Sequence, residues 1–359
     1  MNAIHGKAKN TVNKIYVMEA KNGRLLFVDL LKLLAIYLVL WGHCVQQFLT
    51  SSPLENDVYV YIYSFHMPLF MVLSGYFSSS SISLPFDVFI KKKAQQLLLP
   101  VLSWSVLAFF LYFIMDYSIL HKGINQILED SLVRTLGNFW FLKSLFVCYL
   151  IAWCGKKSKL PSWVWIIATL LFSQLIAKYN VKIMYPCFLA GMALRNYSDY
   201  IKRNRISIFV ISSLIFLLML FYWDGSFLKP ANLMQALSEN NFYSIANELF
   251  VRAYRMLIGI SASISIYLLF MFLFEKINNQ FLRKMAIMGQ YTLNVYLLQV
   301  LLLEILLREF LCLDSMNILL VNYFVTPLIS LLVLLVCIKI TNLIYKSDRA
   351  GFLLFGRNR

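Results

Sequence analysis

The chain has 359 residues, 60% of them hydrophobic and 14% charged, and its mean hydropathy is +0.70. Soluble domains are about half apolar and about a quarter charged, so this composition argues against a soluble protein. The formal net charge of +16 would suggest nucleic acid in a soluble chain. Membrane proteins instead concentrate Lys and Arg in cytoplasmic loops, and no nucleic-acid partner is expected here.

Ten apolar runs have the length that a hydrocarbon core of about 30 Å requires. They lie near residues 25–48, 58–78, 95–115, 136–154, 162–178, 181–195, 206–223, 248–274, 286–311 and 319–345. Lipid offers no water to free backbone groups, so runs of this length must be helical. The first run lacks a small-residue cleavage site and is expected to remain as a span rather than to be removed as a signal peptide. The sequence therefore predicts an all-α polytopic membrane protein with about ten transmembrane helices.

Basic clusters at residues 91–93, 156–159 and 202–205 fall on one side of the membrane if the chain has ten spans. The positive-inside rule then predicts that both termini are cytoplasmic. Residues 1–24 and 346–359 would be cytoplasmic tails, and residues 25–345 would form the transmembrane domain. The longest outer segments are too short to form a core of their own.

The first span carries ionisable side chains in the stretch "DLLKLLAIYLVLWGHCVQQF" (29–48). A charge within the bilayer costs about 3 kcal/mol or more, so such residues indicate a functional site. Lys32 and His43 are 11 residues apart, which places them on one helix face about 16 Å from each other. Asp29 precedes Lys32 by three positions and can pair with it. This stripe is expected to face the protein interior.

Other spans bring ionisable groups to the outer half of the membrane, where two pairs are spaced i,i+4. These groups are His66, Lys143, Glu248 with Arg252, Arg255, and Glu304 with Arg308. Together they predict a polar cavity that opens to the outside, with His43 and His66 at its floor. Each residue taken alone also fits a structural role, such as a packed histidine, an interfacial ion pair or a snorkelling lysine. The histidines and cysteines lack metal-ligand spacing, so no metal is expected.

The motifs, in their order along the chain, resemble those of the integral-membrane acyltransferase family 3, especially the fucose O-acetylase-like polysaccharide O-acetyltransferases. The first span has a basic–x10–His pattern from Lys32 to His43, with Asp29 before it. The other matching blocks are "FHMPLFMVLSGYF" (65–77), "FIKKKAQQLLLPVLSW" (89–104), "NFWFLKSLF" (138–146), "YPCFLAGMALR" (185–195) and "MGQYTLNVYLLQ" (288–299). The chain departs from the family where it has Lys32 in place of the usual Arg, and where it has Gln299 in place of a common His.

The resemblance implies transfer of an acetyl group from cytosolic acetyl-CoA to a hydroxyl of a cell-surface polysaccharide or lipid-linked glycan. The reaction would take place at the outer face of the bacterial inner membrane, among membrane lipids. His43 is expected to be the general base, because histidine titrates near neutral pH. Asp29 and Lys32 would meet the donor, and His66 would hold the tautomer of His43 or act as a second acid or base. The expected substrate-binding residues are Lys143, Arg252, Arg255, Trp140, Gln299 and Glu304.

Ten helices around a polar outer cavity also suit a polytopic transporter or flippase for a glycan or a small anionic solute. Transporters often contain repeated halves with paired broken helices, and no such pairing is found in the sequence. A transporter would not need a cytosolic thioester, so a test with labelled acetyl-CoA separates the two classes. A membrane-embedded receptor is a third alternative, which the lack of a sizeable soluble module disfavours.

Overall fold

The computed structural model describes residues 25–119, 124–229, 238, 241–276 and 279–357. These residues form helices and connecting segments, without a β-strand among them, so the predicted all-α class is confirmed. Six helices are long and apolar enough to cross a membrane, or up to seven if the bent pair α7–α8 is one span. Two of the expected spans contain shorter apolar helices, Ser162–Gln174 and Arg205–Phe221. The total of ten spans and the cytoplasmic location of the termini stay predictions.

The described helices have these bounds. The α-helices are α2 (Leu26–Phe48), α3 (Asp57–Tyr76), α4 (Ser79–Ile82), α5 (Phe86–Lys93), α6 (Leu99–Ile119), α7 (Ile124–Gly137), α8 (Trp140–Lys157), α9 (Ser162–Gln174), α10 (Val181–Asn196), α11 (Ser198–Arg203), α12 (Arg205–Phe221), α14 (Phe242–Lys276), α15 (Gln280–Met288), α16 (Thr292–Gln299), α17 (Ile318–Leu320), α18 (Thr326–Ile344) and α19 (Asp348–Phe355). Three segments are π-helical: η2 (Ala94–Leu98), η6 (Val300–Leu306) and η8 (Val321–Val325).

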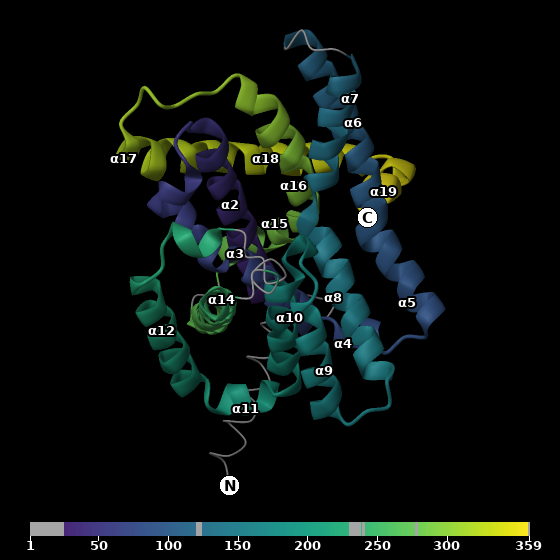
Figure 1. Ribbon diagram of the computed structural model, residues 1–359, viewed down its shortest axis with the longest axis vertical. Coiled ribbons are helices and arrows are strands. Elements are labelled where there is room, and N and C mark those ends of the chain that lie inside the picture. Colours follow the sequence, from purple (N-terminus) through teal and green to yellow (C-terminus); the bar gives the residue numbers. More distant parts are fainter. Residues whose placement is uncertain (1–24, 120–123, 230–237, 239–240, 277–278, 358–359) are drawn as a thin grey trace.

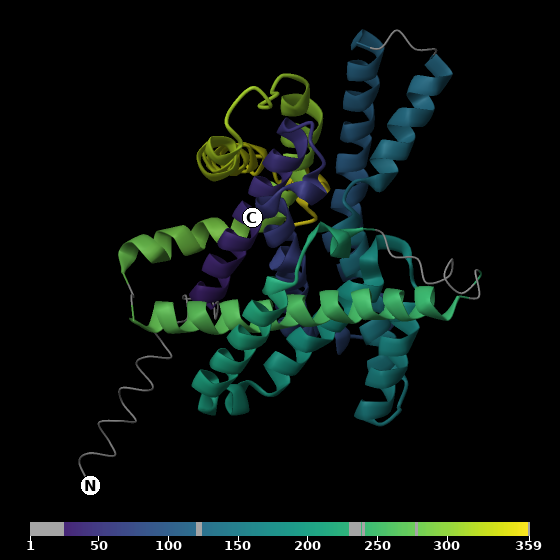
Figure 2. The same ribbon diagram turned by 60° about the vertical axis from the view of Figure 1, so that its left-hand side comes forward.

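The helices cross one another instead of forming a parallel bundle. In Figure 1 α14 is seen end-on while α18 lies across the view, and in Figure 2 α14 runs lengthwise. Helices α2 and α3 lie at the centre, where α3 packs against α2, α10 and α14. Helices α6 and α7 form a hairpin that projects from the rest of the described chain (Figure 2). Residues carried by α2 and α3 are therefore the ones that most other elements can reach.

Close packing of α3 against α10 depends on two glycines. A Cβ atom at Gly75 would collide with the backbone carbonyl of Phe188, and one at Gly191 would collide with that of Val72. Small residues let helix backbones approach closely, which is a common basis of helix association in membranes. These glycines belong to the second-span and "YPCFLAGMALR" motifs, so both motifs have a packing reason in this fold.

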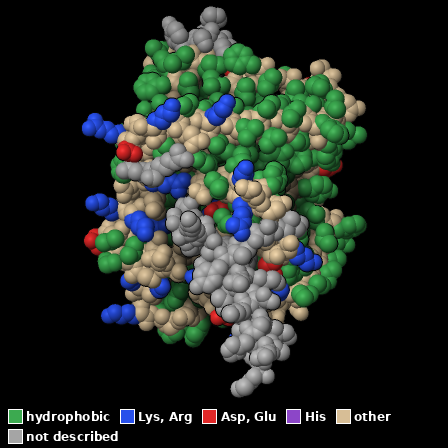
Figure 3. Space-filling model, turned by 180° about the vertical axis from the view of Figure 1, so that it is seen from behind, with side chains coloured by type: hydrophobic (Ala, Val, Ile, Leu, Met, Phe, Trp, Pro, Cys, Tyr) green, Lys and Arg blue, Asp and Glu red, His purple; other side chains and the backbone are tan. Residues whose placement is uncertain are grey.

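The outer surface is strongly apolar. Along α12, large side chains such as Val210, Leu214 and Phe221 are exposed, and α18 exposes Leu328 and Leu335. Figure 3 shows hydrophobic side chains gathered over the upper part of one face, with Lys and Arg mostly beside and below them. Exposed apolar surface of this extent indicates contact with a membrane. The chain is therefore an integral membrane protein.

Candidate functional site

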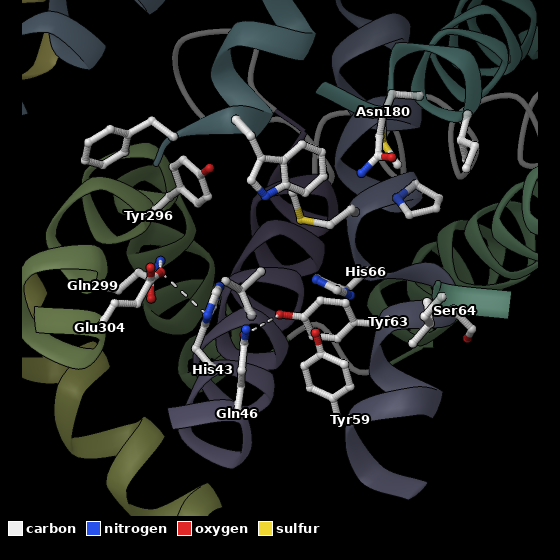
Figure 4. A pocket seen from close by; sticks show the side chains of 18 of the residues that line it. His43, Gln46, Tyr59, Tyr63, Ser64, His66, Asn180, Tyr296, Gln299 and Glu304 are labelled. Carbon is white, nitrogen blue, oxygen red and sulfur yellow. Dashed lines mark hydrogen bonds and ion pairs between the residues drawn. The ribbon is translucent and has the colours of Figure 1, made fainter. Parts of the chain in front are cut away.

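A cavity of about 350 Å³ lies among α2, α3, the start of α8, α14 and α16–η6, and we call it the His43 cavity. It contains six of the ten residues that the sequence analysis expects to be catalytic or to bind substrate. These are His43, His66, Trp140, Arg255, Gln299 and Glu304. Figure 4 shows His43 facing Gln299 and Glu304 from one side, with His66 across the cavity. Both span histidines thus reach the same space from different helices.

His43 faces a carboxylate. Its Nδ1 lies 3.6 Å from Oε1 of Glu304, just beyond hydrogen-bond distance. The side chain of Gln299 donates from Nε2 to the same Oε1 at 3.2 Å (Figure 4). Gln299 itself is almost fully buried, so this amide limits the positions that the Glu304 carboxylate can take.

The local helix winding explains why Glu304 points to His43. Val300–Leu306 is π-helical, and in a π-helix each backbone hydrogen bond joins residues five apart instead of four. This wider winding brings the side chains of Gln299 and Glu304, which are five residues apart, within hydrogen-bond distance. The i,i+4 spacing predicted instead a pair between Glu304 and Arg308. Within the described part of the chain, the ion pair of Glu304 is with His43. π-helical turns occur often at functional sites.

His66 is buried and held by its own helix. Its Nδ1–H donates to the carbonyl of Ile62 at 2.7 Å, because a carbonyl can only accept. Its ring packs edge-on against Tyr63, with centroids 4.5 Å apart. This bond leaves Nε2 as the acceptor nitrogen of a neutral ring. The group that faces Nδ1 of His43 is Glu304, and the acid–base role of His66 stays a prediction.

Aromatic and amide groups complete the cavity wall. Tyr59 and Tyr63 stack with centroids 3.8 Å apart, and the Tyr63 hydroxyl donates to Oε1 of Gln46 at 3.4 Å (Figure 4). The sequence reasoning missed Gln46, Asn180 and Tyr296 as lining residues. Gln46 follows His43 by three positions on the same helix, so i,i+3 spacing was a signal for it. The sequence holds no comparable signal for Asn180.

Of the cationic residues expected here, Arg255 lines the His43 cavity, whereas Lys143 and Arg252 do not. Arg255 has no acidic partner among the described residues. Arg252 is only 3% exposed, donates from Nη1 to the carbonyl of Gln174 at 3.1 Å, and lies 3.9 Å from Glu248. Its contacts are therefore with Gln174 of α9 and with Glu248 of its own helix.

Lys143 closes the bend between α7 and α8. Its ammonium donates to the carbonyls of Leu136 and Asn138, each at 2.8 Å. The two helices meet at 48°, and Phe139 between them is left-handed, with φ of 55°. The bend carries Trp140 to the cavity wall. Lys143 thus holds the backbone that presents Trp140.

A second cavity of about 600 Å³ contains Asp29 and Lys32, and we call it the Lys32 cavity. Lys32 donates to Asp29 at 3.0 Å, as the i,i+3 spacing predicts. Lys93 also lines this cavity and lies 3.6 Å from the ring centroid of Tyr149. Much of the remaining wall is apolar, including Phe70.

The two cavities meet at Met67 and Tyr296, because both residues line both spaces. Both side chains are buried, with Met67 6% exposed and Tyr296 9% exposed, and each forms part of the wall of both cavities. Helix α2 runs past both, with Lys32 in one and His43 in the other. The polar stripe of the first span thus connects two spaces.

No group of three or more His, Cys, Asp or Glu side chains suited to a metal occurs in the part of the chain that the structure describes. A reaction without a metal stays a prediction.

Comparison with known proteins identifies relatives. The family model described as "Acyltransferase domain", of the acyltransferase 3 type, matches residues 25–342. The chain is similar to the nodulation protein NolL of Mesorhizobium japonicum, with 34% identity over 134 residues, 36% of this chain and 35% of that protein. It is also similar to the nodulation protein NolL of Sinorhizobium fredii, with 32% identity over 140 residues, 36% of each chain. The alignments thus span about a third of the length of these curated relatives. No solved structure matches the chain.

Proposed function

Because this chain belongs to the acyltransferase family 3, we propose that it is a membrane O-acyltransferase that uses acetyl-CoA. The acceptor is a hydroxyl of a cell-surface polysaccharide or a lipid-linked glycan at the outer face of the bacterial inner membrane. The observation that carries this proposal is the pairing of His43 with Glu304 in a cavity that adjoins a second, cationic cavity.

In the proposed reaction the acceptor hydroxyl binds beside Nε2 of His43. Nε2 takes the hydroxyl proton while the oxygen attacks the carbonyl carbon of the thioester. The tetrahedral intermediate then collapses, the carbon–sulfur bond breaks, and His43 returns the proton to the departing thiolate. Glu304 holds the tautomer with the proton on Nδ1 and stabilises the ring once it is charged, as the acid of a catalytic triad does. The separation of 3.6 Å is compatible with this role, since such contacts often tighten only when substrate binds.

The cavity offers groups for the acceptor and for the developing charge. Arg255 lines it without an acidic partner in the described chain, so its guanidinium is available to an oxyanion or to an acidic group on the glycan. Trp140 and the stacked Tyr59 and Tyr63 provide faces for a sugar ring. Gln299 acts indirectly, through Glu304. We assign Lys143 and Arg252 to supporting this site rather than to contacting substrate.

The donor is assigned to the Lys32 cavity. The positive-inside rule puts Lys32 toward the cytosol, where coenzyme A is found. Lys32 meets a phosphate or the thioester carbonyl, and Asp29 orients its ammonium. The pantetheine arm lies along the apolar wall, and the acetyl group passes Met67 and Tyr296 to reach His43. An extended arm suits the separation of about 16 Å along α2.

The test uses membrane vesicles that contain the full chain, labelled acetyl-CoA and purified surface glycan. Label on the glycan that requires His43 supports the proposal, and His43→Ala should lower the transfer rate by about a hundredfold or more while the chain still inserts. Full activity of His43→Ala contradicts the assignment of the base. Movement of glycan across the membrane without acetylation would instead identify a transporter or flippase.

A further inference from the structure

The C-terminal helix α19 is docked on α6. The Ser103 hydroxyl donates to the carbonyl of Leu353 at 2.8 Å, and the Trp104 indole donates to that of Leu354 at 2.7 Å. Phe355 is only 1% exposed, and its ring lies 5.9 Å from that of Trp104. Residues 346–357 are therefore part of the packed structure.

A glycine turns the chain after α19 back toward the Lys32 cavity. Gly356 has a φ of +67°, which L-residues rarely adopt, and a Cβ atom there would collide with the carbonyl of Gln95 in η2. The next residue, Arg357, donates from Nε to the Tyr345 hydroxyl at 3.3 Å and from Nη2 to the carbonyl of Gln290 at 3.1 Å. These bonds fix its guanidinium in the cavity wall, although Arg357 is exposed.

The Lys32 cavity has an excess of positive charge. Its charged lining residues are three cations, Lys32, Lys93 and Arg357, and one carboxylate, Asp29, which pairs with Lys32. Lys93 is only 6% exposed, and neither it nor Arg357 has an acidic partner among the described residues. The Lys93 ammonium packs on the ring of Tyr149 but has no carboxylate beside it, and a buried charge without a counter-ion is unfavourable, so this arrangement favours a bound anion.

We propose that Arg357 and Lys93 form the phosphate site for the nucleotide part of the donor, so that the C-terminal segment belongs to the donor site. This inference rests on the proposed use of a coenzyme A thioester. The two hydrogen bonds of Arg357 within the protein use Nε and Nη2, so Nη1 can still donate to a ligand. The planar guanidinium group matches the geometry of phosphate oxygens. The ammonium of Lys93 supplies a second positive charge in the lining of the same cavity. The apolar part of the cavity then receives the pantetheine arm.

The test measures calorimetric binding of coenzyme A and of pantetheine, which lacks the nucleotide, to the full chain in phosphatidylcholine nanodiscs. Arg357→Gln should weaken coenzyme A about tenfold or more and leave pantetheine unchanged, because only coenzyme A carries the phosphates. Arg357→Lys should recover part of the affinity. Arg349→Gln is the matched control, since Arg349 is exposed on α19 and does not line the cavity.

The outcomes separate this inference from the proposed function. If the unaltered chain binds no coenzyme A, the donor assignment fails and this inference fails with it. If coenzyme A binds equally to the unaltered chain and to Arg357→Gln, only the role of Arg357 is overturned. The role of Arg357 is also overturned if Arg349→Gln weakens coenzyme A binding as much as Arg357→Gln does. In nanodiscs with phosphatidylglycerol, loss of retained lipid in Arg357→Gln at unchanged coenzyme A affinity would assign the cations to a lipid headgroup and overturn the inference.

Discussion

Glu304 lies 3.6 Å from the imidazole of His43, and a π-helical turn between Gln299 and Glu304 is what points it there. In this arrangement the carboxylate acts through His43 and does not touch the substrate. Glu304 is thus a positioning residue in the proposed reaction.

Replacing Glu304 should therefore affect turnover more than binding. We expect Glu304→Gln to lower kcat about 10- to 100-fold with little change in KM for acetyl-CoA, since orientation of the base matters mainly in the transition state. The measurement is a steady-state acetylation assay with both substrates varied. Glu309→Gln, at an exposed carboxylate five residues on, is the control. An effect on KM alone would show that Glu304 binds substrate instead.

Substitutions at Lys32 and Asp29 test donor binding. Comparing a single with a double variant separates the loss of the cation from the cost of leaving a buried carboxylate unpaired. Asp29 is 5% exposed, so Lys32→Met leaves a buried carboxylate without its partner, whereas Asp29→Asn with Lys32→Met removes both charges. We expect both variants to raise KM for acetyl-CoA about tenfold, because both remove the cation that meets the donor. An unchanged KM for acetyl-CoA in the double variant would show that Lys32 has a structural role and does not bind the donor.

Arg255 should report on the charge of the acceptor. We expect Arg255→Gln to raise KM for an acidic glycan about tenfold and to change KM for a neutral glycan much less, since a charged hydrogen bond is lost only with the former. Arg308→Gln, at an exposed arginine that does not line the His43 cavity, is the matched control. Equal effects on the two glycans would favour stabilisation of the oxyanion over recognition of the acceptor.

Lys143 should matter chiefly for stability. Lys143→Met leaves two carbonyls at the α7–α8 bend without their charged donor, and we expect a loss of about 2 kcal/mol. The thermal midpoint of the purified chain measures this loss, with Lys92→Met on an exposed lysine as the control. A normal midpoint combined with a large rise in KM for the acceptor would return Lys143 to substrate binding.

Local sequence patterns predicted several features correctly, because these features depend on residues that are close in the sequence. The apolar runs predicted helices, and the i,i+3 spacing predicted the pair of Asp29 with Lys32. The helical repeat placed Lys32 and His43 on one face of the first span, and each lines a cavity. The same approach was wrong for the partner of Glu304, because it assumed an α-helical repeat where the chain is π-helical.

What the sequence by itself determined was the class of the protein and its polar first span, since composition, run length and helical periodicity act over short stretches of chain. Only the tertiary structure decided which distant groups meet. It brought Glu304 to His43, bonded Lys143 to the bend before Trp140, and placed Arg357 and Lys93 in the wall of one cavity. These contacts depend on helix crossing, on π-helical winding and on a left-handed turn at Gly356, none of which a periodic pattern specifies.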